Sequence, residues 1–179
     1  MSHAAITVVT VALLGACSAA AVPTGSPAAN AALALCNRAD DATEVEKAAL
    51  LDQGLELAEQ AVEADVQDPA AHFAVFCTLG KRTELDRAPL RSLFALRRLR
   101  RELDLTLALV PNDPDALAAK GALLFNLPRL FGGDTMEAEH YLRRALEIEP
   151  TNDEARRYLV RVLTARGASE EANALLVSH

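Results

Sequence analysis

The sequence predicts an all-α fold in which antiparallel helix hairpins stack into a short superhelix of about seven or eight helices. Hydrophobic residues make up 51% of the chain and aromatic residues only 4%. Ala, Leu, Glu and Arg dominate, and these residues lose little conformational freedom when they enter a helix. The stretches of helical pattern are interrupted at Pro or Gly, and small residues recur at fixed spacings in the second half. Together these observations favour a chain of paired helices.

The first sixteen residues have the pattern of a targeting signal. Residues 4–16 are apolar or small and uncharged, too few to cross about 30 Å of hydrocarbon but typical in length of a signal-peptide core. They end in Leu14-Gly15-Ala16-Cys17, which resembles the lipobox of bacterial lipoproteins. The resemblance implies a signal peptide over residues 1–16, a diacylglycerol anchor on Cys17 and a place in the bacterial cell envelope. The alternative is a simple secretory signal cut near residues 19–21.

Residues 17–29 are expected to form a flexible tether between the anchor and the folded domain. The segment is rich in Ala, Ser, Pro and Gly and carries no charge. Ser18 follows the anchor cysteine, where Asp is a common inner-membrane retention signal in Gram-negative bacteria. Its absence resembles outer-membrane sorting, so the expected location is the periplasmic face of the outer membrane. The helical domain is expected to span residues 30–179.

Several helix boundaries in that domain have a physical signature. Asp68-Pro69 and Asp113-Pro114 each place an N-cap acceptor before a Pro at the first helical position. Asp134 and Glu137 have the spacing of a capping box. The predicted helices are 30–39, 43–65, 69–80, 89–110, 114–126, 135–148, 152–166 and 169–177.

Small residues repeat at the spacing of a helix-hairpin array. Ala138, Ala145 and Pro150 are separated by seven and five residues, and Ala172 follows Ala138 by thirty-four. Gly121 stands on the preceding predicted helix. Paired helices that approach closely need side chains no larger than Ala or Gly at such sites. The pattern resembles the tetratricopeptide repeat, and the resemblance covers about residues 45–178.

Two insertions separate this chain from the regular thirty-four-residue period. Pro111 and Pro150 are thirty-nine residues apart, and the five extra residues fall in the turn 126–133. A weaker unit with Gly54 and Ala61 precedes them, followed by an insertion of roughly eleven residues around 81–95.

The long turn indicates a resemblance to one particular group of tetratricopeptide-type proteins. Its string Leu127-Pro128-Arg129-Leu130-Phe131-Gly132-Gly133-Asp134 looks like that of the tetratricopeptide-type lipoproteins grouped with the T component of TRAP transporters. That resemblance implies a periplasmic substrate-binding protein as partner.

The charge distribution bears on the kind of partner. The net charge of −7 argues against nucleic acid, because phosphate contacts need a basic surface. Eight basic residues nevertheless gather in residues 81–101: Lys81, Arg82, Arg87, Arg91, Arg97, Arg98, Arg100 and Arg101. They form either a solvated helix face or a docking patch for an acidic partner or lipid headgroups. The candidate contact residues are Arg97, Arg98, Arg100 and Arg101.

The three cysteines suggest one disulfide. If Cys17 is lipidated, Cys36 and Cys77 remain as an even pair in an oxidising compartment. We expect these two to be bridged, and two separate buried thiols are the alternative.

We find no pattern that predicts catalysis, a metal or a cofactor. The histidines His3, His72, His140 and His179 include no close pair and none stands near a cysteine. No Gly-rich phosphate loop or nucleophile motif occurs. The protein is therefore not expected to be an enzyme.

The turn 126–133 allows two interpretations. In one, it is a rigid plug in which Leu127, Leu130 and Phe131 are buried. In the other, Arg129 and Phe131 lie at the lip of the concave surface and contact a ligand. The predicted function is a non-enzymatic envelope lipoprotein that acts as a protein–protein scaffold. The alternative is a binder of a small apolar or lipid-like ligand in a groove of the helical stack.

Overall fold

The computed structural model describes residues 25–86 and 89–177, so the predictions for Cys17 and the signal segment lie outside the described residues. The described chain is all-helical, which confirms the predicted fold class. Its elements are α1 (Pro27–Arg38), α2 (Glu44–Ala64), α3 (Pro69–Asp86), α4 (Pro89–Leu109), α5 (Pro114–Asn126), the 3-10 turn η1 (Arg129–Phe131), α6 (Thr135–Ile148), α7 (Asp153–Ala165) and α8 (Ser169–Val177). None of the helices in these residues is both long and apolar enough to span a bilayer.

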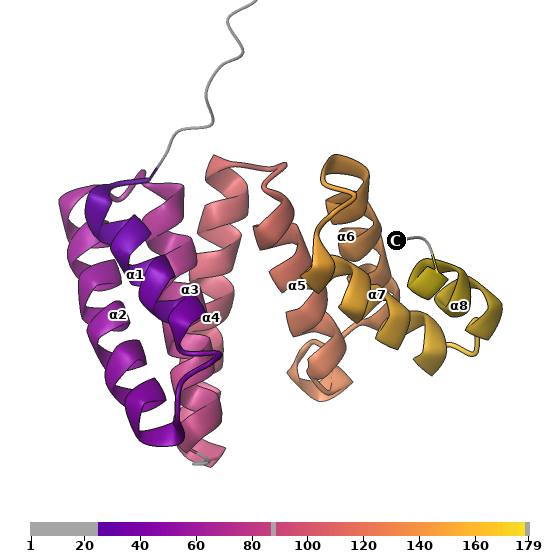
Figure 1. Cartoon of the computed structure of the whole chain (residues 1–179), viewed down its shortest axis with the longest axis horizontal. Helices are drawn as coiled ribbons and strands as arrows, with labels where there is room; N and C mark the ends of the chain where they lie inside the picture. Colours follow the sequence, from indigo (N-terminus) through magenta and orange to yellow (C-terminus); the bar gives the residue numbers. More distant parts are fainter. Residues whose placement is uncertain (1–24, 87–88, 178–179) are drawn as a thin grey trace, which may run out of the picture.

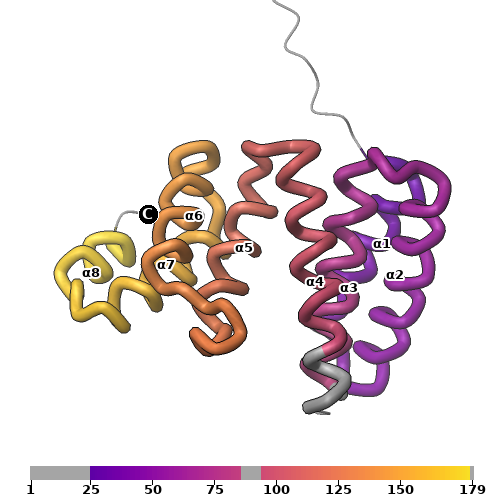
Figure 2. The backbone as a smooth tube through the Cα atoms, turned by 180° about the vertical axis from the view of Figure 1, so that it is seen from behind, coloured from indigo at the N-terminus to yellow at the C-terminus, as the bar shows by residue number. Residues whose placement is uncertain are grey.

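Consecutive helices pair as antiparallel hairpins that stack along one direction from α1 to α8 (Figure 1). The reverse view shows the same order, with α1–α4 at one end and α5–α8 at the other (Figure 2). The caps that the sequence predicts start these helices. Asp113 Oδ1 accepts a hydrogen bond from the Ala116 amide at 2.8 Å, and Asp134 Oδ1 accepts from the Met136 amide at 2.8 Å. Local side-chain chemistry therefore sets several of the boundaries.

Small residues permit the close approach within the α5/α6 hairpin. A Cβ added to Gly121 would lie 2.5 Å from Leu142 Cγ and 3.0 Å from the Ala138 carbonyl oxygen. Ala138 and Ala145 are fully buried. The repeated spacing in the sequence therefore reflects the contact surface between paired helices.

Two boundaries in the first half differ from the prediction. Helix α1 begins at Pro27 because Ser26 caps it: Ser26 Oγ accepts from the Ala29 amide at 3.2 Å. Residues 27–29 of the expected tether therefore belong to the first helix. Helix α3 continues through Gly80 to Asp86, so the insertion at this point lengthens the α3/α4 hairpin instead of forming a loop.

The core is continuous in the second half and divided in the first. One large cluster joins α5 to α8 and includes Leu117, Leu124, Leu142, Leu159, Val162 and Leu163. Smaller clusters, rich in Ala, join α1, α2 and α3. The two halves meet through Leu103 of α4 and Ala116 and Ala119 of α5, with Phe73 and Phe76 of α3 packed against them.

A disulfide also fastens the first half. Cys36 on α1 and Cys77 on α3 are joined, with their Cα atoms 6.3 Å apart. This pair is the one that the sequence predicts as a bridge.

Candidate functional site

Two of the four arginines proposed as contacts already have carboxylate partners. Arg98 Nη1 lies 2.7 Å from Glu59 Oε1 on α2, and Arg101 Nη2 lies 2.6 Å from Glu102 Oε1. These ion pairs line an open hollow between α2, α3 and α4. Because neighbouring carboxylates match their charges, Arg98 and Arg101 offer less net charge to a partner, and the Arg98–Glu59 pair also joins α4 to α2.

The other two arginines have no such partner among the described residues. Arg97 is exposed on α4. Arg100 donates from Nη2 to the main-chain carbonyl oxygen of Phe131 in the turn after α5. The basic segment and the long turn, which are thirty-one residues apart, therefore meet.

Main-chain hydrogen bonds hold the long turn, and its apolar tip is exposed. The carbonyl oxygen of Pro128 accepts from the amides of Phe131 at 2.8 Å and Gly133 at 3.0 Å. Gly132 adopts a φ of 77°, which Gly reaches without steric cost. Leu130 is 87% exposed and Phe131 43% exposed, so the interpretation of this turn as a buried plug is wrong. Hydrogen bonds from the Glu137 and Met136 amides lower the pKa of the Asp134 carboxyl, and the positive charge of the exposed Arg129 adds a smaller lowering.

A second cationic surface, absent from the sequence-based candidates, lies where α5 ends beside α7. We call it the α7 patch: Phe125, Asn126, Arg157, Tyr158 and Arg161. The Arg161 guanidinium lies 4.8 Å from the Tyr158 ring centroid and 5.2 Å from the Phe125 ring centroid. Asn126 contacts both the Tyr158 hydroxyl and Arg161 at 3.4 Å. No ion pair joins Arg157 or Arg161 to a carboxylate within the described part of the chain, so the patch is positively charged.

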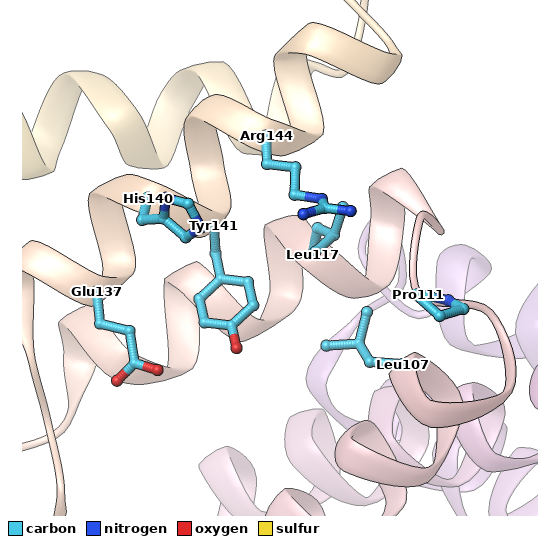
Figure 3. A pocket seen from close by; sticks show the side chains of 7 residues that line it. All are labelled: Leu107, Pro111, Leu117, Glu137, His140, Tyr141 and Arg144. Carbon is cyan, nitrogen blue, oxygen red and sulfur yellow. The ribbon is translucent and has the colours of Figure 1, made fainter.

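An open hollow separates α4 from α6 (Figure 3). Its volume is about 300 Å³, and Leu107, Leu117 and Tyr141 give it an apolar floor. The Tyr141 and Glu137 side chains project away from the α6 backbone, and both line the hollow together with Leu107 of α4. Glu137 and Arg144 lie on its exposed rim.

The sequence did not predict a buried polar pair, His72 and Glu102. His72 Nδ1 lies 2.7 Å from Glu102 Oε2, and both side chains are 4% exposed. His72 Nε2 lies 3.0 Å from the Val66 carbonyl oxygen, so each ring nitrogen has an oxygen within hydrogen-bonding distance. Burial alone would raise the pKa of Glu102, but hydrogen bonds from Arg101 and His72 outweigh it and hold that pKa below its ordinary value. Because both ring nitrogens have a partner and both side chains are buried, the pair is suited to joining α3 to α4.

The described residues offer no cluster of three or more His, Cys, Asp or Glu side chains that could hold a metal ion. What they offer instead are cations and aromatic rings on the surface, which suit recognition of another molecule.

Comparisons with known proteins agree with this architecture. Residues 132–178 match the family profile described as tetratricopeptide repeat. The first TPR of Spaghetti (RPAP3) bound to the HSP90 peptide SRMEEVD is similar, with a TM-score of 0.50 and 20% identity over 78% of this chain and 95% of that one. The first TPR domain of the human RPAP3 protein has a TM-score of 0.51 and 20% identity, over 80% and 98% of the two chains. The sequence matches no curated protein at a significant level.

These likenesses show the fold. The helix hairpins have the arrangement of a tetratricopeptide-repeat domain, and a recognisable repeat covers the last part of the chain. Folds of this kind stack their hairpins into extended surfaces that bind other proteins.

Proposed function

We propose that the protein is a non-catalytic scaffold that binds an acidic segment of another protein at the α7 patch. The observation that carries the proposal is the placement of Arg161 over Phe125 and Tyr158 without a carboxylate partner. Arg166, at the end of α7, is by contrast neutralised, because its Nη1 pairs with Glu139 Oε2.

The chemistry of the patch fits a carboxylate ligand. An Arg guanidinium presents a planar fork of donors that matches a carboxylate, and stacking on aromatic rings restricts its rotamers before the ligand arrives. Asn126 adds an amide beside it. Arg and Tyr are also the residues that most often dominate the free energy of binding at protein interfaces.

The structural neighbour supplies a precedent for the class of ligand. The first TPR of Spaghetti is bound to a seven-residue peptide, SRMEEVD, in which three residues are acidic. We extend to this chain only the idea that a short acidic segment is the ligand.

We also propose that the domain is anchored in the bacterial envelope through Cys17, with a substrate-binding protein of the TRAP type as its partner. The lipobox-like string at residues 14–17 supports the anchor. The Cys36–Cys77 disulfide is consistent with an oxidising compartment such as the periplasm.

A binding assay with a matched control tests the function. Fluorescence anisotropy would compare a labelled SRMEEVD peptide with SRMQQVN, in which neutral amides replace the three acidic side chains. Arg161→Ala should weaken binding of the acidic peptide by about tenfold, or about 1.4 kcal/mol. The control is Arg166→Ala, which also removes one positive charge, at the C-terminal end of α7. Because Glu139 neutralises Arg166, this variant should change the affinity by less than twofold. Equal effects of the two variants, or equal affinity for the two peptides, would refute the proposal.

The Figure 3 hollow favours a second function, uptake of a small apolar ligand. Its floor of Leu107, Leu117 and Tyr141 could contact an apolar body. In that case Tyr141→Ala would abolish binding of an apolar fluorescent probe, and Arg161→Ala would leave it unchanged.

A further inference from the structure

Three residues of α4 form a ridge that ends at the long turn. Phe94, Arg97 and Arg100 follow one another at i,i+3 spacing, so their side chains are neighbours along the helix surface. The ridge extends about 9 Å along the helix axis. Arg100 contacts the carbonyl oxygen of Phe131, which joins the ridge to the turn. We call the combined area the α4–turn surface: Phe94, Arg97, Arg100, Leu130 and Phe131.

The surface exposes large apolar side chains on a fixed frame. Phe94 is 74% exposed, Leu130 87% and Phe131 43%. Single exposed hydrophobic residues are common, but here three lie on one ridge and the turn that adjoins it. Main-chain hydrogen bonds fix the turn, including one from the Asp134 amide to the Leu124 carbonyl oxygen at 3.1 Å. A fixed frame loses little conformational entropy on binding, which favours affinity.

The positive charges of Arg97 and Arg100 on the ridge favour an acidic binding partner. Arg97 makes no ion pair with a described carboxylate, and the carbonyl partner of Arg100 leaves its charge uncancelled. The adjacent Arg98, by contrast, is neutralised by Glu59. The uncancelled charge therefore lies beside the exposed apolar residues.

We propose that the α4–turn surface docks an acidic protein segment whose apolar side chains pack on Leu130 and Phe94 while its carboxylates bind Arg97 and Arg100. This surface is separate from the α7 patch and extends the proposed scaffold to a second contact area. A protein is favoured over a bilayer because the turn lies at the opposite end of the hairpins from the start of α1 (Figure 1). If the proposed lipid anchor precedes α1, the turn is at the end of the hairpins farther from the point of attachment.

Binding of synthetic probes tests the proposal, with every variant made in the Arg161→Ala background so that the α7 patch does not contribute. The main probe is a labelled twelve-residue peptide of Glu and Asp that carries two Leu and one Phe. The second probe has Ser in place of the apolar residues, and the third is a phosphatidylcholine vesicle containing phosphatidylglycerol. Arg97→Glu and Leu130→Ser are the test variants. Arg38→Glu and Val45→Ser are their controls, because Arg38 is exposed on α1 and Val45 is 84% exposed on α2.

We expect each test variant to weaken binding of the main probe at least tenfold and each control by less than twofold. The Ser-substituted peptide should bind at least tenfold more weakly than the main probe to the Arg161→Ala protein that carries no further substitution. Loss of binding that is as large in the controls would overturn the proposal. Binding to the vesicles that Arg97→Glu abolishes, without peptide binding, would overturn it in favour of a lipid surface. Because the Arg161→Ala background is used throughout, neither result depends on the α7 patch.

Discussion

Substitution of Ala at Gly121 and at Gly80 should change stability in opposite directions, although both glycines lie inside helices. An Ala in a helix interior is favoured over Gly by up to about 1 kcal/mol. At Gly80 the added Cβ would meet only Leu99 Cδ2, at an ordinary 3.7 Å. Gly80→Ala should therefore raise the free energy of unfolding by about 0.5–1 kcal/mol.

At Gly121 the added Cβ would meet Leu142 Cγ at 2.5 Å and a main-chain oxygen at 3.0 Å. Leu142 is fully buried, so it cannot withdraw into solvent. Overpacking of this kind costs about 1–3 kcal/mol, and a contact this short belongs to the upper part of that range. After the gain in helix propensity is subtracted, Gly121→Ala should lower the free energy of unfolding by about 1–2 kcal/mol.

Urea denaturation followed by circular dichroism would measure both changes. In thermal unfolding, each kcal/mol corresponds to a shift in Tm of about 2–4 °C for a domain of this size. If Gly121→Ala raises the Tm as Gly80→Ala does, α5 and α6 do not approach as closely as described, and the explanation of the repeated small residues fails.

Three further predictions concern the disulfide, the buried pair and the anchor. The Cys36–Cys77 disulfide joins residues that are 41 apart in the sequence, and its reduction should lower the free energy of unfolding by about 4 kcal/mol in the chain-entropy account. If mass spectrometry finds both cysteines alkylated in the unreduced protein, there is no bridge. Because the pKa of Glu102 is lowered in the folded state, its stabilisation is present above its ordinary pKa and is lost as the pH falls through the lowered value. The free energy of unfolding should therefore fall more steeply below about pH 4.3 in the parent protein than in Glu102→Gln, and parallel pH profiles would contradict this. In a bacterial host, Cys17→Ser should abolish fatty-acid labelling and release the protein from the membrane fraction, whereas unchanged labelling would end the lipoprotein hypothesis.

The sequence predicted those features of the fold that depend on short-range contacts. The start of α5 follows from Asp113 and Pro114, which act within one helical turn. The close approach of α5 and α6 follows from Gly121 and Ala138, because small residues at fixed spacing are directly visible. The start of α1 was missed because Ser26 is positioned partly by a hydrogen bond to Asp68, forty-two residues away.

The candidate site was predicted less completely, for the same physical reason. Arg97 and Arg98 are adjacent and equivalent in the sequence, but only Arg98 faces Glu59 on α2. Exposure of Leu130 depends on main-chain hydrogen bonds in the turn, and hydrophobicity alone favoured its burial. The α7 patch needs Phe125 and Arg161 together, and their contact spans two hairpins.

Chemical-shift mapping on the ¹⁵N-labelled protein tests the central claim, binding of an acidic segment at the α7 patch, most directly. The SRMEEVD peptide would be titrated against the parent protein and against Arg161→Ala, and amide shifts would be followed residue by residue. We expect the largest shifts at residues 122–127 and 156–163, and their loss in Arg161→Ala. Shifts concentrated around the Figure 3 hollow, at residues 137–144, or the same shifts in both proteins, would contradict the claim.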